Sequence, residues 1–137
     1  MRRPDPGAGW QPVPCPDDDA LVIGALFVVV SGPPGSGKST LAPGLAHDLG
    51  LPLIAKDTIK DALMSVLPVP DVEASRRIGR SAVAAMLAVA TESPTGAVIE
   101  SNFHRTVAVA DLRRLPGQVV EVFCRCPVCQ ADVSHLV

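Results

Sequence analysis

The sequence predicts an α/β fold, a three-layer sandwich around a mostly parallel sheet of about four strands. Two apolar runs rich in β-branched residues, 26–30 and 97–99, contain no polar alternation. Such runs are typical of strands that are buried on both faces of a parallel sheet. Segments with apolar residues at helical spacing separate them, and strands that alternate with helices favour parallel pairing.

The first helix is predicted from Lys38, because apolar residues recur at Leu41, Leu45 and Leu49 before Gly50 stops the pattern. The remaining elements follow from similar patterns and from proline and glycine breaks. The expected order is strand 21–31, helix 38–49, strand 51–55, helix 58–67, helix 72–90, strand 97–101, helix 107–115 and strand 119–124. Residues 82–90 are almost wholly apolar, and we expect them in the core.

Composition limits the classes of function. A chain of 137 residues with 47% hydrophobic and 19% charged residues suits one domain. The net charge of −2 provides no overall positive field for nucleic acid, which we expect only as a substrate end. The longest apolar run, 20–30, is too short to span a bilayer, and no apolar stretch follows Arg2 and Arg3 as in a secretory signal. We therefore expect a soluble, cytoplasmic protein without a membrane partner.

Both ends of the chain differ in character from its middle. Residues 1–20 are rich in proline and acidic side chains, which predicts a disordered leader. Residues 21–126 form the predicted domain, and 127–137 form a divergent tail. Three cysteines and a histidine near this end, Cys124, Cys126, Cys129 and His135, are interpreted as reduced thiols or, alternatively, as a metal site with an uncommon zinc spacing.

A phosphate-binding pattern, Gly-x-x-x-x-Gly-Lys-Ser, lies between the first predicted strand and the first predicted helix. Glycines allow backbone amides to point at phosphate oxygens, and the helix N-terminus adds its dipole. Lys38 is expected on the β- and γ-phosphates, and the Ser39 hydroxyl on Mg²⁺. The pattern predicts a site for ATP and Mg²⁺ formed by Gly32, Pro33, Pro34, Gly35, Ser36, Gly37, Lys38, Ser39 and Thr40.

Pro43 is unusual in the helix that follows this loop. It has no amide hydrogen for the carbonyl of Ser39, and its ring crowds that carbonyl. We expect the first turn to be kinked or strained, with a cost to nucleotide affinity.

Four segments together resemble the small P-loop kinases: 28–40, 56–60, 100–103 and 120–126. The most similar group is the AAA-type "predicted kinases", which are similar to polynucleotide 5′-hydroxyl kinase, zeta toxin and chloramphenicol phosphotransferase. The resemblance spans residues 21–126 and implies a P-loop NTPase-like fold. It also implies transfer of the ATP γ-phosphate to a hydroxyl of a small molecule or a nucleic-acid end.

The resemblance implies roles for residues beyond the loop. Asp57 matches an aspartate that accepts the proton of the substrate hydroxyl, although it could alternatively cap the following helix. Lys60 stands where an arginine binds substrate in the relatives. Glu100 resembles a Walker B carboxylate that supports Mg²⁺, or it is simply a polar strand end. Among Arg76, Arg77 and Arg80, two could face the cleft or all could be solvated; we assign Arg77 to substrate.

The relatives continue into a helical lid whose arginines have no counterpart here, and truncation or a frame change near Pro127 would explain this difference. Two hypotheses follow. The first is a phosphotransferase acting on an unidentified hydroxyl acceptor, and the second is a nucleotide-binding module with weak or no catalysis. GTPase switching is disfavoured because the chain has no Asn-Lys-x-Asp guanine signature.

Overall fold

A computed structural model describes residues 24–103 and 105–125 of the chain. The expected leader, the expected tail, His104 and three members of the cysteine and histidine cluster (Cys126, Cys129 and His135) lie outside the described residues. The described elements are β1 (Ala25–Ser31), α1 (Lys38–Leu49), β2 (Leu53–Ala55), α2 (Lys56–Met64), α3 (Val72–Thr91), β3 (Gly96–Glu100), α4 (Arg105–Leu112) and β4 (Gly117–Phe123).

The strands form one four-stranded sheet in the order β2-β3-β1-β4, and every neighbouring pair is parallel. The predicted parallel α/β fold is therefore confirmed. β1 and β3 occupy the centre, and β3 is buried along its whole length, as its unbroken apolar pattern predicts. Because all strands run in one direction, their carboxyl ends meet at one edge of the sheet.

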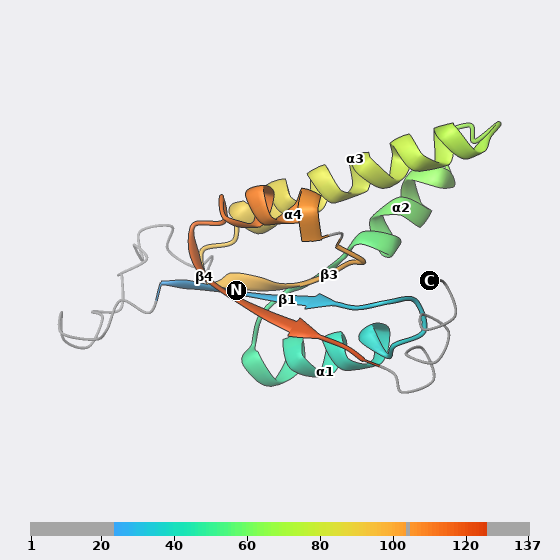
Figure 1. Cartoon of the computed structure of the whole chain (residues 1–137). Coiled ribbons are helices and arrows are strands. Elements are labelled where there is room, and N and C mark those ends of the chain that lie inside the picture. The colour runs from blue at the N-terminus through green and yellow to red at the C-terminus, as the bar shows by residue number, and fades with distance from the viewer. Residues whose placement is uncertain (1–23, 104, 126–137) are drawn as a thin grey trace, which may run out of the picture.

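Helices cover both faces of the sheet (Figure 1). α1 packs on one face, where Ala42 and Ala46 contact the cluster that contains Val28, Val30 and Val98. α2, α3 and α4 lie on the other face, where Phe27, Ile99 and Met86 form the centre of a second cluster. The alternation of side chains along each strand supplies both layers, since neighbours such as Phe27 and Val28 point to opposite faces.

The predicted burial of residues 82–90 is only partly correct. One stripe of α3 is buried, formed by Ala82, Met86 and Ala90, whereas Val89 is 57% exposed. Positions four residues apart share one face of a helix, and the described part of the chain places no further layer over the opposite face of α3. None of the helices in the described part of the chain combines the length and apolar character that a membrane crossing requires.

Several predicted boundaries shift by a few residues. β2 continues directly into α2, which begins at Lys56 and not at Thr58, and ends at Met64 and not at Leu67. Similarly, α4 covers 105–112 where 107–115 was predicted. α1 is one continuous helix from Lys38 to Leu49 that contains Pro43 in its interior. Figure 1 shows that α2 and the start of α3 project beyond the sheet at the edge where β1 ends.

Candidate functional site

The segment between β1 and α1 has a backbone that glycine alone adopts easily. Gly32, Gly35 and Gly37 have φ values of 143°, 73° and 91°, in the region that side chains with a Cβ disfavour. At Gly32 a Cβ would also overlap the carbonyl oxygen of Cys124, the residue that follows β4. The close approach of β4 therefore requires glycine at the start of the predicted phosphate loop.

The predicted phosphate loop ends at the N-terminus of α1, where backbone amide donors are available to a ligand. Gly37 is the N-cap residue, and no side chain caps the helix. The first amides of a helix have no intrahelical acceptor, and the helix dipole favours negative charge there. This end of α1 consequently fits a phosphate group, as the sequence pattern predicts.

Lys38 folds back over the loop. Its Nζ donates a hydrogen bond of 2.7 Å to the carbonyl oxygen of Pro33, and the residue is only 8% exposed. Among the described residues no carboxylate forms an ion pair with Lys38. The ammonium group therefore lies within the loop with its positive charge available to an anion.

Ser39 and Glu100 meet at the carboxyl edge of the sheet. The Ser39 hydroxyl donates a hydrogen bond of 3.1 Å to Glu100 Oε1. Glu100 ends β3 and is 9% exposed, so the carboxylate is held against the first turn of α1. A hydroxyl beside a carboxylate is a pair of hard oxygen ligands, which Mg²⁺ prefers.

Among the described residues, Ser39 and Glu100 are the two side chains that we assign to a metal ion. They contain no group of three or more His, Cys, Asp and Glu side chains that could hold a metal by itself. Magnesium in phosphate-transfer sites is commonly held by one or two protein oxygens together with substrate phosphates and water. The Ser39–Glu100 pair therefore fits a metal ion that arrives with a nucleotide, and no permanent metal centre is indicated.

Ser36 adds a further polar group inside the loop. Its hydroxyl oxygen is buried and has no hydrogen-bond partner among the described residues. A buried hydroxyl without a partner is destabilising in the folded state. It is consistent with a loop whose polar groups are completed by a bound ligand.

Asp57 does not cap α2, which was one of the two roles expected for it. Asp57 is the second residue of α2, and Ala55 is the N-cap residue, so the capping interpretation is wrong. The reason is that β2 runs into α2 without a loop. The Asp57 side chain is 77% exposed and lies 3.6 Å from Lys56 Nζ.

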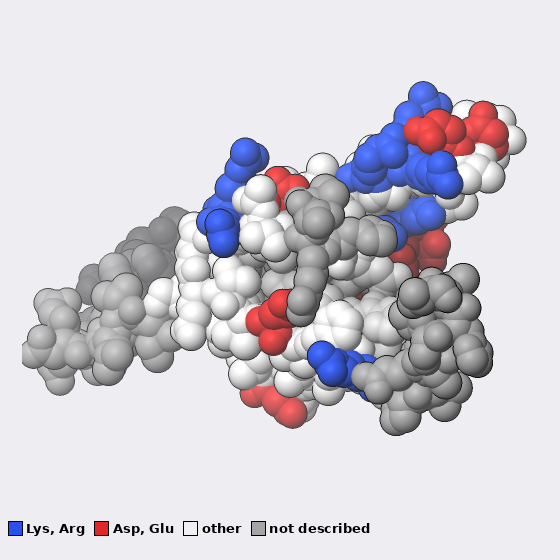
Figure 2. Space-filling model, viewed as in Figure 1, with Lys and Arg blue, Asp and Glu red and all other residues white. Residues whose placement is uncertain are grey.

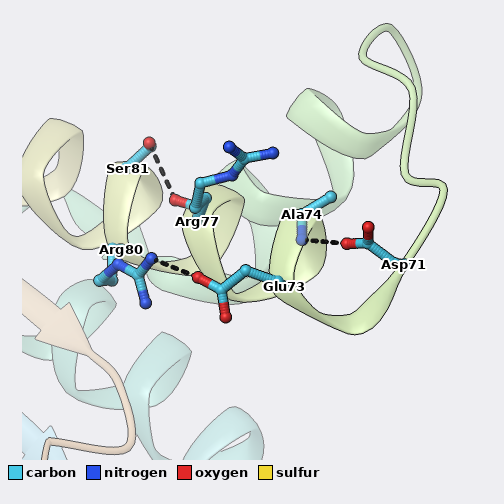
Figure 3. Close-up of polar contacts among 6 residues, drawn as sticks. All are labelled: Asp71, Glu73, Ala74, Arg77, Arg80 and Ser81. Atoms are coloured by element: carbon cyan, nitrogen blue, oxygen red, sulfur yellow. Dashed lines mark hydrogen bonds and ion pairs between the residues drawn. The ribbon is translucent and has the colours of Figure 1, made fainter.

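An open cleft of about 950 Å³ lies between α2, α3, α4 and the end of β3. We call it the α3 cleft. Lys60, which the resemblance assigns to substrate binding, lines it, and so do Arg76 and Arg80. Arg77 and Asp57 are not among its lining residues. Figure 3 shows the guanidinium of Arg80 directed toward Glu73, whereas that of Arg77 points away from this pair.

The end of β3 connects the loop and the cleft. Glu100 bonds to Ser39 on the α1 side, whereas Ser101 lines the α3 cleft. The amide of Ser101 donates to the carbonyl of Val30, 3.2 Å away, next to the start of the phosphate loop. Two consecutive residues thus connect the phosphate site and the α3 cleft.

Comparison with known proteins agrees with this geometry. An inferred kinase from Chloroflexus aurantiacus has a similar structure with a TM-score of 0.71 and 29% identity, covering 75% of this chain and 60% of that protein. The chain has the fold of a P-loop kinase. A sugar kinase from Janibacter sp. HTCC2649 matches with a TM-score of 0.52 and 26% identity, covering 80% of this chain and 66% of that one.

A P-loop kinase is also found by sequence. Adenylate kinase from Chlamydia caviae is 42% identical over 48 residues, which is 34% of this chain and 22% of that protein. No family model matches the chain. The chain thus spans 60% of the Chloroflexus protein and about a fifth of adenylate kinase. The resemblance to P-loop kinases that the motifs implied is confirmed.

Sequence reasoning missed several residues of the α3 cleft. Ser101 is predicted only as the last residue of strand 97–101, and Lys56 has no predicted role, although both line the cleft. The helical spacing of Arg76 and Arg80, four residues apart, indicates a shared face that excludes Arg77. That spacing could have identified the two arginines that line the cleft.

Proposed function

We propose that this chain binds Mg·ATP at its phosphate loop and transfers the γ-phosphate to a hydroxyl group of an acceptor in the α3 cleft. One observation carries the proposal: Glu100 and Ser101 are adjacent in sequence, yet one bonds to Ser39 and the other lines the cleft. Phosphoryl transfer requires chiefly that donor and acceptor are held side by side. The end of β3 provides this proximity.

Each residue of the site has a role in the proposed reaction. The α1 amides and Lys38 hold the phosphates and neutralise charge. Ser39 and Glu100 hold Mg²⁺, which when bound neutralises phosphate charge. Asp57 does not itself line the α3 cleft, but its carboxylate lies 3.6 Å from Nζ of Lys56, which does, and it is the group that we propose accepts the proton of the acceptor hydroxyl. The acceptor oxygen forms a bond to the γ-phosphorus, the bond from that phosphorus to the β,γ-bridging oxygen breaks, and ADP leaves with its electron pair.

The proposal is tested by separating binding from turnover. Titration calorimetry with Mg·ATP measures binding, and release of ADP over a panel of hydroxyl compounds measures transfer. We expect Lys38→Ala to weaken Mg·ATP binding by about tenfold or more, because a charge-assisted contact is lost. If Lys38→Ala binds Mg·ATP as tightly as wild type does, the phosphate site is assigned wrongly.

Asp57→Asn addresses the chemical step. We expect this variant to bind Mg·ATP normally and to lose acceptor-dependent ADP release by about 10²–10⁴-fold, the usual contribution of a general base. Asp61→Asn is the matched control, because Asp61 is an exposed carboxylate on the same helix. Binding of Mg·ATP without ADP release in any reaction would favour the alternative, a nucleotide-binding module without catalysis. We propose the cytoplasm as the location of the protein.

A further inference from the structure

The walls of the α3 cleft carry an excess of positive charge. Its lining includes five cationic side chains, and Asp111 is the single carboxylate among the lining residues. The cations come from α2, from α3 and from the segment that follows α4: Lys56, Lys60, Arg76, Arg80 and Arg114. Figure 2 shows blue side chains gathered where α2 and α3 project beyond the sheet.

Carboxylates neutralise three of these five cations. Arg80 pairs with Glu73 at 3.0 Å, Arg114 with Asp111 at 4.0 Å and Lys56 with Asp57 at 3.6 Å. Lys60 and Arg76 form no ion pair with any described carboxylate. Two cationic groups on facing helices therefore line the cleft without a counter-charge from the described residues.

The floor of the cleft contains a second, independent feature. Ser101 is 5% exposed, and its hydroxyl oxygen is buried without a hydrogen-bond partner among the described residues. Burial without a partner is unfavourable for a hydroxyl, so the group is suited to a ligand that completes it. Apolar side chains from α3 and the β3–α4 segment, Val83, Leu87 and Phe103, line the same cleft and fit a carbon skeleton.

We infer that the acceptor is a small hydroxyl compound that carries an anionic group, a phosphate or a carboxylate, bound by Lys60 and Arg76 with Ser101 beneath its polar part. This inference rests on the proposed function and names its substrate class. A polynucleotide end is disfavoured, because carboxylates interrupt the cations and leave no continuous positive track for a phosphate backbone. The net charge of −2 agrees with this choice.

Three probes with a six-carbon skeleton test the charge requirement: glucose, gluconate and glucose 6-phosphate. Each is titrated at constant ionic strength into the ¹⁵N-labelled full chain saturated with Mg·ADP, which fills the phosphate loop. We expect at least one anionic probe to bind about tenfold more tightly than glucose and to shift the amide resonances of Lys60, Arg76 and Ser101. The preference between gluconate and glucose 6-phosphate identifies the anionic group.

Single substitutions test which cationic side chains bind the anionic group of the probe. Lys60→Met and Arg76→Ala should each remove most of the preference for the anionic probe. Arg77→Ala is the matched control, because it removes the same charge from α3 at a residue that does not line the cleft. Equal losses in Arg76→Ala and Arg77→Ala would indicate only a general field and would overturn the inference.

Ser101→Ala is expected to change two measurable quantities, the melting temperature and the affinity for the anionic probe. Removing a buried hydroxyl that has no partner among the described residues should raise the melting temperature of the free protein. The same substitution should lower the affinity for the anionic probe by about two- to tenfold. A lower melting temperature together with unchanged probe affinity contradicts the role assigned to Ser101.

The remaining outcomes separate the inference from the proposed function. If Mg·ADP does not bind, the proposed function fails. If Mg·ADP binds but the anionic probes show no advantage over glucose, only the inference fails. A 5′-hydroxyl oligonucleotide that shifts the same amides and binds more tightly than every hexose probe would overturn the assignment to a small molecule.

Discussion

Replacing Glu100 by glutamine isolates the contribution of one buried charge to metal-dependent nucleotide binding. The substitution preserves the shape of the side chain and an oxygen that can accept the 3.1 Å bond from Ser39. The free energy of unfolding without ligand should therefore change by less than about 1 kcal/mol. The affinity for Mg·ATP should fall, because replacing a group that supports a bound metal ion typically lowers metal affinity or activity by about 10–100-fold.

The size of the effect on melting follows from linkage. At a ligand concentration of about 100 times the dissociation constant, binding stabilises the folded state by about 2.7 kcal/mol. A weakening of about 10- to 100-fold reduces this stabilisation to about 1.4–0.4 kcal/mol. For a domain of this size the melting temperature with Mg·ATP should then lie about 5–11 °C below that of wild type under the same conditions.

The assay is thermal unfolding with no ligand, with ATP and excess chelator, and with Mg·ATP. Glu121→Gln serves as the control, because Glu121 also accepts a serine hydroxyl, that of Ser31 at 2.9 Å. Glu121 lies beside Val29, Phe103 and other residues on the face opposite α1. The reasoning is refuted if both variants respond alike, or if Glu100→Gln loses as much stabilisation by metal-free ATP as by Mg·ATP.

Two further predictions concern stability. Pro43→Ala should raise the melting temperature, since Pro43 lies inside α1 and proline in a helix interior costs up to about 3 kcal/mol relative to alanine; a lower value would show that the helix accommodates the ring without strain. Met86→Ala should reduce the free energy of unfolding by about 2–5 kcal/mol, because a buried side chain leaves a cavity, and Met86 is 0% exposed. Val89→Ala on the same helix, at 57% exposure, should change it by less than about 1 kcal/mol, and denaturant titration of both variants compares the two losses.

The phosphate loop was predictable because its information is local. Glycines at fixed spacing, a buried strand before them and a helix after them all lie between residues 26 and 50. The backbone of Gly32, Gly35 and Gly37 has the positive φ values that those glycines permit. Boundaries were less predictable, as at the β2–α2 junction, because a strand can enter a helix without the turn residues that mark most helix starts.

The α3 cleft was harder to predict because it joins segments from different parts of the chain. Helical spacing would have separated Arg77 from Arg76 and Arg80, but which face meets a cavity depends on how α3 packs against α2 and β3. The packing of Met86, Phe27 and Ile99 decides this orientation. The unpartnered state of the Ser101 hydroxyl is likewise a property of its surroundings and has no sequence signal.

The alternation of strands and helices, the phosphate loop and the acidic residue at the end of β3 could all be predicted from the amino-acid sequence, because each depends on residues close together in the chain. The contact of Glu100 with Ser39, which is 61 positions away, and the position of Ser101 in the lining of a cationic cleft depend instead on how distant segments pack. Parallel pairing of β1 with β3 brings these groups together, and the alternation of a strand sends adjacent side chains to opposite sides.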